Sequence, residues 1–153
     1  VAYQLATQTR YPSYGWWKKQ GANTLWEDWK GSYSHNHIMF GDISAWFYRN
    51  LAGIQPDIRQ PGFKHIIIRP QPAGNLRWVR AEHLTPYGAV KVVWRIRKKQ
   101  FVLEVTVPAN TTAQVTLPVK SRQAVLAADG KPAGNKPVYA IGSGTSRYTC
   151  RWA

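Results

Sequence analysis

The stretch "AVKVVWRIRKKQFVLEVTV" (residues 89–107) contains two runs in which apolar residues occupy every second position. The first run would place apolar side chains on one side of a strand and basic ones on the other: Val90, Val92, Trp94 and Ile96 against Lys91, Arg95 and Arg97. The second run repeats this pattern: Phe101, Leu103, Val105 and Val107 against Glu104 and Thr106. Lys98, Lys99 and Gln100 fit a short connection between the runs. The stretch therefore predicts a β-hairpin with one face in a core and the other in water.

Short apolar runs of the same kind lie on both sides of this hairpin. They are "HIIIRP" (65–70), "LRWVRAEH" (76–83), "AQVTLPV" (113–119), "QAVLA" (123–127) and "SRYTCRW" (146–152). Turn residues separate them, and with the hairpin they make seven or eight strands. This pattern predicts an antiparallel β-sandwich over residues 58–153.

The first third of the chain has a different period and composition. The first 54 residues hold twelve of the twenty aromatic residues. The stretch "HIMFGDISAWFYRNLAGI" (37–54) predicts a helix with one apolar face, formed by Phe40, Ile43, Phe47, Leu51 and Ile54, and Gly53 and Pro56 are placed to end it. We expect an earlier helix over residues 1–10 and a structured loop over 11–36, with a short helical turn at 25–29.

These patterns together predict an α+β chain. A short helical segment (1–57) is followed by an antiparallel β-sandwich (58–153), and the Pro- and Gly-containing stretch 54–65 is typical of a linker or domain edge. The hydrophobic content of 44% argues against disorder, and no apolar run approaches the ~20 residues of a membrane span. The single Cys150 excludes an internal disulfide and a multi-cysteine zinc site. The net charge of +14 is scattered along the chain, so it gives weak support to nucleic-acid binding.

The stretch "TLWEDWKGSYSHNHIMFG" (24–41) combines tryptophans, carboxylates and histidines. Flat aromatic faces with carboxylates and polar donors are typical of sugar sites, where a carboxylate can perform acid–base work. Glu27 lies between Trp26 and Trp29, so we expect its carboxylate to be partly desolvated and suited to proton transfer. Each tryptophan could equally belong to a core, and Asp28 could be a helix cap or a surface charge.

A metal site is the competing interpretation of the same stretch. In an extended segment His35 and His37 would point the same way and could join Glu27 as ligands. Two histidines at this spacing are weak evidence, and a hydrogen-bonded histidine that contacts substrate or structure is favoured. We expect no metal and no cofactor.

Longer motifs make a resemblance visible. The sequences "YPSYGWWKKQGANTLWEDW" (11–29) and "SHNHIMFGDISAWFYRNLAGI" (34–54) resemble the bacterial α-L-rhamnosidases, which are inverting glycoside hydrolases. The resemblance continues through "PGFKHIIIRPQP" (61–72) and "VTVPANTTAQVTLP" (105–118) and weakens after about residue 120. It implies an (α/α)6-barrel catalytic domain followed by a C-terminal sandwich, of which residues 1–57 would be the last part of the barrel.

The resemblance also implies roles for single residues. Glu27 matches the glutamate of the family's "T-x-W-E" block, which is the general base, and His37 matches the histidine that touches rhamnose. Trp26 and Trp29 are carried over less directly as walls of the pocket, and Asn36, a polar group of the sugar-site interpretation, is a further expected substrate contact. The general acid would come from upstream sequence, so the chain alone is expected to be inactive.

The expected partner is a rhamnose-containing glycoside, with no nucleic acid and no membrane. Self-association, or pairing with the missing barrel segment, is also expected because the aromatic helices would leave an apolar face uncovered. A periplasmic or extracellular location is favoured. The alternatives are a non-catalytic carbohydrate-binding or structural β-sandwich module and, more weakly, a basic nucleic-acid-binding domain.

Overall fold

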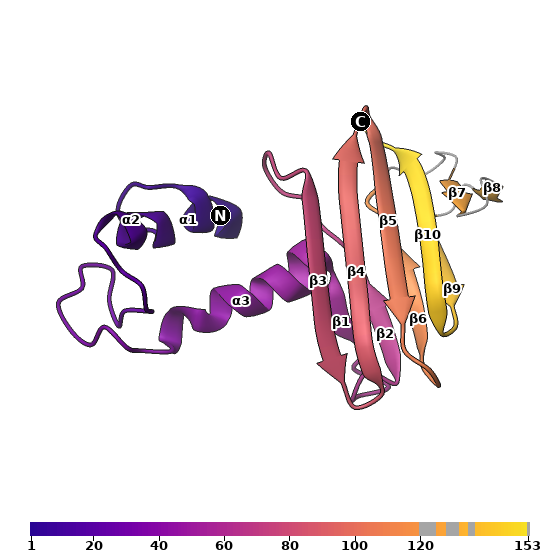
Figure 1. Cartoon of the computed structure of the whole chain (residues 1–153), viewed down its shortest axis with the longest axis horizontal. Coiled ribbons are helices and arrows are strands. Elements are labelled where there is room, and N and C mark those ends of the chain that lie inside the picture. The colour runs from indigo at the N-terminus through magenta and orange to yellow at the C-terminus, as the bar shows by residue number, and fades with distance from the viewer. Residues whose placement is uncertain (120–124, 128–131, 135–136, 153) are drawn as a thin grey trace. The chain divides into compact units, whose positions relative to one another are not determined.

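A computed structural model describes residues 1–119, 125–127, 132–134 and 137–152. The chain divides into two compact units, Val1–Phe47 and Tyr48–Ala153 (Figure 1). The first holds short helices and a long loop, and the second opens with the end of the last helix and is otherwise built from strands, which confirms the predicted α+β class. None of the helices in the described part of the chain is long and apolar enough to cross a membrane.

The first unit has less helix at its start than predicted, and more further on. Helix α1 covers Ala2–Thr7 rather than residues 1–10. Helix α2 covers Tyr14–Lys19, inside the stretch predicted as loop. Its N-cap is Ser13, whose hydroxyl accepts the backbone N–H of Trp16 at 3.0 Å, so the capping residue was the missed sequence signal. The helical turn predicted at 25–29 is wrong, because these residues are extended or in turns.

The helix predicted over 37–54 is present but shorter, and its winding changes along its length. A 3₁₀ turn η1 (Met39–Gly41) leads into helix α3 (Asp42–Trp46) and then into a π-helical segment η2 (Phe47–Ala52). Phe47, expected on the apolar face, is 40% exposed. Gly53 ends the helix as predicted, with φ +80°. Ile54 belongs to the next strand, not to the helix.

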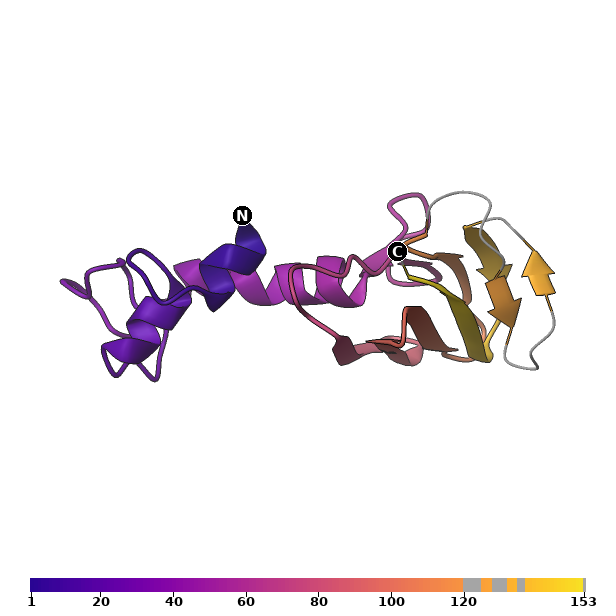
Figure 2. The same cartoon turned by 90° about the horizontal axis from the view of Figure 1, so that it is seen from above.

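The second unit is a sandwich of two sheets, seen face-on in Figure 1 and from above in Figure 2. One sheet has the order β1-β2-β6-β9: Ile54–Pro56, His65–Ile68, Thr112–Thr116 and Val138–Ile141. The other has the order β3-β4-β5-β10-β7-β8: Trp78–Thr85, Gly88–Arg97, Gln100–Val107, Gly144–Arg151, Val125–Ala127 and Pro132–Gly134.

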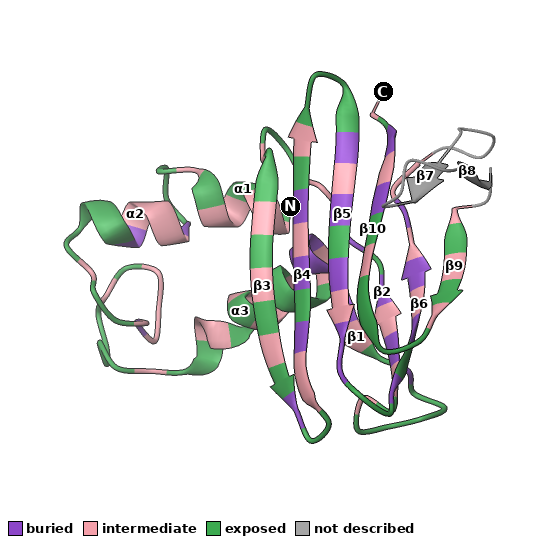
Figure 3. Cartoon of the chain, turned by 45° about the vertical axis from the view of Figure 1, so that its right-hand side comes forward, coloured by how far each residue is buried: buried purple, intermediate pink, exposed green. Residues whose placement is uncertain are grey.

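The predicted hairpin forms the centre of the six-stranded sheet. Strands β4 and β5 pair antiparallel, with Lys98 and Lys99 alone in the turn and Gln100 already paired with Arg97. Both turn lysines have positive φ, 48° and 59°, as a two-residue type I′ turn requires. Burial alternates along both strands (Figure 3), and every predicted inward residue except Ile96 is at most 2% exposed. Trp94 is fully buried and donates its indole N–H to the backbone oxygen of Leu51 at 2.7 Å.

Two features of the sandwich departed from the prediction. Strands β2 and β6 pair parallel, because the chain visits the other sheet for three strands, β3 to β5, before it returns. The short strands β1, β8 and β9 were not predicted. Stretch 54–65, interpreted as a linker or domain edge, contributes β1, which pairs antiparallel with β2. Of "QAVLA", residues 125–127 form β7, while 123 and 124 lie outside the described residues.

Candidate active-site loop

Residues 24–37 form a loop whose two arms are held together by backbone hydrogen bonds. The N–H of His37 donates to the carbonyl of Leu25, and the N–H of Glu27 donates to the carbonyl of Ser34, both at 2.8 Å. The Thr24 hydroxyl donates to the carbonyl of His35. These bonds fix the register of the arms, with Glu27 opposite Ser34 and Leu25 opposite His37.

Asp28 closes the turn between the arms. Its Oδ1 accepts the N–H of Lys30 at 2.7 Å, and its Oδ2 accepts those of Ser32 and Tyr33 at 2.9 and 3.1 Å. Burial acts to raise the pKa of Asp28, but the backbone N–H groups around it outweigh burial and lower the pKa below its ordinary value. Asp28 is therefore a structural carboxylate of the turn, neither the helix cap nor the simple surface charge that were considered.

Gly31 and Trp26 fit together inside this turn. Gly31 has φ +74°, and a Cβ atom there would lie 2.4 Å from Cζ3 of the Trp26 ring. His35 stacks on the Trp26 ring at 4.3 Å between centroids with an interplanar angle of 12°. The Nε2 atom of His35 lies 3.0 Å from the Gly31 carbonyl oxygen. His35 thus belongs to the frame of the loop.

The tryptophans beside Glu27 form part of an aromatic core. Trp17 of α2 is 2% exposed and contacts the rings of Trp26 and Trp29 at 5.9 and 4.5 Å between centroids. Its indole N–H donates to the carbonyl of Trp29 at 3.1 Å. Phe40 packs on Trp29 at 4.5 Å, and the Tyr14 hydroxyl donates to the Phe40 carbonyl at 2.6 Å. The loop is thereby anchored to α2 and to the start of the last helix.

Glu27 and His37 are left at the open side of the loop. Glu27 Oε2 lies 3.9 Å from His37 Nδ1, and the two side chains are 41% and 39% exposed. The same Oε2 accepts the N–H of Ser34 at 3.3 Å. Glu27 is thus partly buried, while the neighbouring tryptophan rings pack on Trp17. The arrangement provides a positioned carboxylate with an accessible oxygen and an imidazole beside it.

The metal interpretation required His35 and His37 to converge with Glu27. Instead, His35 stacks on Trp26, and only His37 lies near the carboxylate. Within the described residues, no three His, Cys, Asp or Glu side chains gather as potential metal ligands. Asn36 is exposed, and its backbone N–H donates to the Ser34 hydroxyl at 3.2 Å. Sequence reasoning missed Ser34 and Gly31, although a glycine so close to two tryptophans was an available signal.

Two family models cover most of the chain. Residues 1–51 match the six-hairpin glycosidase domain of bacterial α-L-rhamnosidases, and residues 53–130 match their C-terminal domain. An α-L-rhamnosidase of Streptomyces avermitilis is 34% identical over 97% of this chain, which covers 16% of that protein. One from Formosa agariphila is 37% identical over 82% of this chain, which covers 14% of that relative.

Solved structures give the same result. The α-L-rhamnosidase of Dictyoglumus thermophilum matches 98% of this chain with a TM-score of 0.88 and 34% identity, over 18% of that structure. The S. avermitilis enzyme, solved with L-rhamnose, matches 96% with a TM-score of 0.83 and 33% identity, over 16% of that structure. The chain spans about a sixth of its curated relatives, in their C-terminal part. It belongs to the bacterial α-L-rhamnosidase family.

Proposed function

We propose that this chain is the C-terminal portion of an enzyme that removes terminal α-L-rhamnose from glycosides with inversion at the anomeric carbon. Residues 1–57 would complete the (α/α)6 barrel, and residues 58–153 would form the C-terminal sandwich. The two family models meet between residues 51 and 53, which supports a change of domain in this region. The observation that carries the proposal is the Glu27–His37 pair at the open side of an ordered loop.

In this mechanism Glu27 is the general base. It takes a proton from a water molecule, whose oxygen attacks the anomeric carbon as the bond to the leaving oxygen breaks. A general acid on the opposite side of the sugar gives its proton to that leaving oxygen. Inverting enzymes place the two carboxyl groups ~6.5–9.5 Å apart, which leaves room for the water.

The remaining site residues would orient the base and the sugar. His37 would hydrogen-bond a rhamnose hydroxyl through an imidazole nitrogen, and Asn36 would add a polar contact. Trp26 and Trp29 would form walls of the pocket. Their packing on Trp17 supports a further role, because it fixes the backbone on both sides of Glu27.

The general acid would lie in the part of the barrel that precedes this chain. The carboxylate next to Glu27 is unsuited to that role, since both Asp28 oxygens accept backbone N–H groups and its pKa is lowered. Unit Val1–Phe47 also exposes large apolar side chains: Tyr33 at 72%, Ile38 at 85% and Met39 at 57%. These side chains support pairing with the rest of a barrel, or self-association when it is absent.

The test uses a chromogenic α-L-rhamnoside with two proteins. The isolated 153-residue chain should give no turnover. A chimera in which this chain replaces the corresponding segment of the S. avermitilis enzyme should be active. In the chimera, Glu27→Gln should lower kcat by ~10²–10⁴ and leave rhamnose binding largely intact. Asp42→Asn, which removes another exposed carboxylate of the same unit, is the matched control and should keep activity. Full turnover by the Glu27→Gln chimera would refute the role of Glu27.

A further inference from the structure

The two outer faces of the sandwich differ in the charge carried by their strands. On the six-stranded sheet, the outward positions of β3, β4, β5 and β10 carry six basic side chains and two carboxylates. The basic residues are Arg80, Lys91, Arg95, Arg97, Arg147 and Arg151, and the acidic ones are Glu82 and Glu104. All eight are exposed. On the four-stranded sheet, the outward positions of its strands carry no Lys, Arg, Asp or Glu. Among these outward strand positions, charged side chains therefore lie on one surface, here called the basic face.

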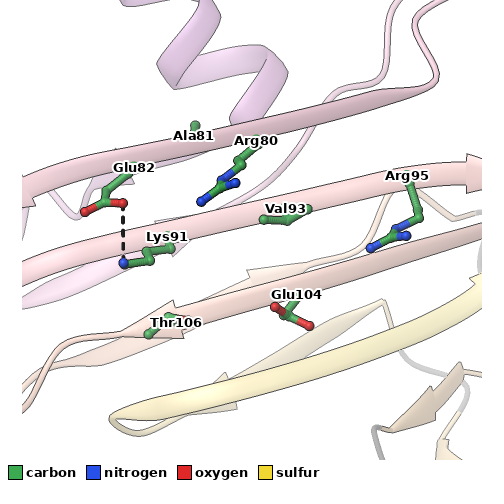
Figure 4. A pocket seen from close by; sticks show the side chains of 8 residues that line it. All are labelled: Arg80, Ala81, Glu82, Lys91, Val93, Arg95, Glu104 and Thr106. Atoms are coloured by element: carbon green, nitrogen blue, oxygen red, sulfur yellow. Dashed lines mark ion pairs between the residues drawn. The ribbon is translucent and has the colours of Figure 1, made fainter.

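A hollow lies at the centre of the basic face, where Val93 is framed by four longer side chains (Figure 4). Arg80 and Glu104 are its paired neighbours on the adjacent strands. Lys91 and Arg95 lie two positions away along β4, so they point to the same side of the sheet. The hollow has a volume of about 320 Å³. A short valine among long charged side chains leaves room there for part of a ligand.

The cations of the hollow are only partly neutralised. Lys91 Nζ lies 3.4 Å from Glu82 Oε2, and this is the only ion pair of the basic face among the described residues. Arg80 and Arg95 have no carboxylate within ion-pair distance in the described part of the chain. Three cations and two carboxylates line the hollow, so a net positive charge remains that an anionic ligand group would offset. A planar guanidinium group also matches a carboxylate with two parallel hydrogen bonds.

An aromatic ring lies at the edge of the same face. Trp78 is paired with Arg95 in the register of β3 and β4, and it is 66% exposed. An exposed indole offers a flat apolar surface next to a guanidinium group. The carboxylates Glu82 and Glu104 can accept hydrogen bonds from hydroxyl groups, so the face suits a ligand in which anionic groups alternate with hydroxyl groups. Cations, hydroxyl acceptors and an aromatic face together fit a sugar chain that bears negative charges better than a nucleic acid.

We propose that the basic face binds an acidic polysaccharide whose sugar units carry carboxylate groups. Arg80 and Arg95 pair with the carboxylates, Glu82 and Glu104 accept sugar hydroxyls, and Trp78 packs against a sugar ring. The residues proposed to bind the polysaccharide are not those of the proposed hydrolytic site. A test of this proposal is therefore independent of the role of Glu27.

The experiment measures binding of oligogalacturonate to the whole 153-residue chain by calorimetry. The fully methyl-esterified oligomer is the neutral control ligand, and a DNA duplex tests the nucleic-acid alternative. We expect binding of the acidic oligomer, little binding of the ester, and a loss of affinity between about 50 and 300 mM salt. Absence of binding, equal binding of the ester, or tighter binding of DNA at the same salt would overturn the proposal.

Two double variants distinguish binding at the basic face from a general effect of the positive charge of the chain. Arg80→Gln/Arg95→Gln should weaken binding about tenfold or more, because two charge-assisted contacts are lost. Lys18→Gln/Lys19→Gln removes the same charge from exposed positions of α2 and should change affinity by less than about twofold, since neither lysine belongs to the basic face and a general charge effect is screened by salt. Equal losses in the two double variants would refute the assignment. Trp78→Ala should weaken oligogalacturonate binding, and an unchanged affinity would remove the aromatic contact from the proposal.

Discussion

Gly31→Ala tests whether the fit between Gly31 and Trp26 holds the candidate loop in shape. Gly31 has φ +74°, a conformation that costs an alanine about 1–2 kcal/mol. The new Cβ would also lie 2.4 and 2.6 Å from two ring atoms of Trp26. The ring has little room to move, because Trp26 is 8% exposed and lies between Trp17 and His35. Overpacking of this kind typically adds about 1–3 kcal/mol, so the total loss should be about 2–5 kcal/mol.

Gly21→Ala is the matched control for this substitution. Gly21 has a similar φ of +84°, but a Cβ there would meet no atom within 4 Å. Its loss should therefore be the conformational part alone, about 1–2 kcal/mol. Both variants would be measured in the full chain by hydrogen exchange at the amides of Glu27 and His37, which are bonded across the loop. Gly31→Ala should reduce their protection much more than Gly21→Ala. Equal effects of the two substitutions would show that the ring contact does not hold the loop.

Three further outcomes follow from the structure. Asp28→Asn should loosen the loop at neutral pH. Because folding lowers the pKa of Asp28, this carboxylate should stabilise the parent chain fully above its unfolded pKa of about 3.9, and the stabilisation should be lost as the pH falls through the folded pKa. Amide hydrogen exchange of the loop, compared between acid and neutral pH, would show this loss. Trp94→Phe should lower the free energy of unfolding, measured in urea, by about 2–4 kcal/mol, because the Leu51 carbonyl loses its 2.7 Å hydrogen bond and a void remains in the core. Trp78→Phe is the control and should lower it very little, since Trp78 is 66% exposed. Cys150, whose pKa burial raises to about 11, should resist alkylation at about pH 8 until urea unfolds the sandwich; rapid labelling of the folded chain would contradict its burial.

The sandwich could be predicted because its central strands obey a local rule. Each run of period two has one face in the core, so the pattern at residues 89–107 specified both the hairpin and its inward side. No local sequence pattern indicates that β2 and β6 pair parallel. This pairing depends on how many strands the chain places in the other sheet before it returns, which is a property of the whole topology. Strands of three residues, such as β1, are too short to show a period at all.

The helices were harder to predict because their limits depend on side-chain contacts between segments that are distant in the sequence. The change to π winding at Phe47–Ala52 follows from no single residue in that stretch. Helix α2 holds only six residues, and its one clear sequence mark was the capping Ser13. Short helices depend on tertiary packing, which here comes from the contact of Trp17 with two tryptophans of the loop.

The residues of the candidate site could be predicted from sequence motifs, but the contacts that position them could not. Glu27 and His37 were singled out from two sequence blocks ten residues apart, and the structure brings them to 3.9 Å. The sequence did not reveal how the two side chains come together. Their contact depends on main-chain hydrogen bonds between the loop arms and on Asp28, whose carboxylate accepts three backbone N–H groups. Asp28 therefore shapes the loop that holds the proposed base. Its removal should broaden the range of Glu27–His37 distances, and in the active chimera it should lower kcat while an Asp42→Asn control does not.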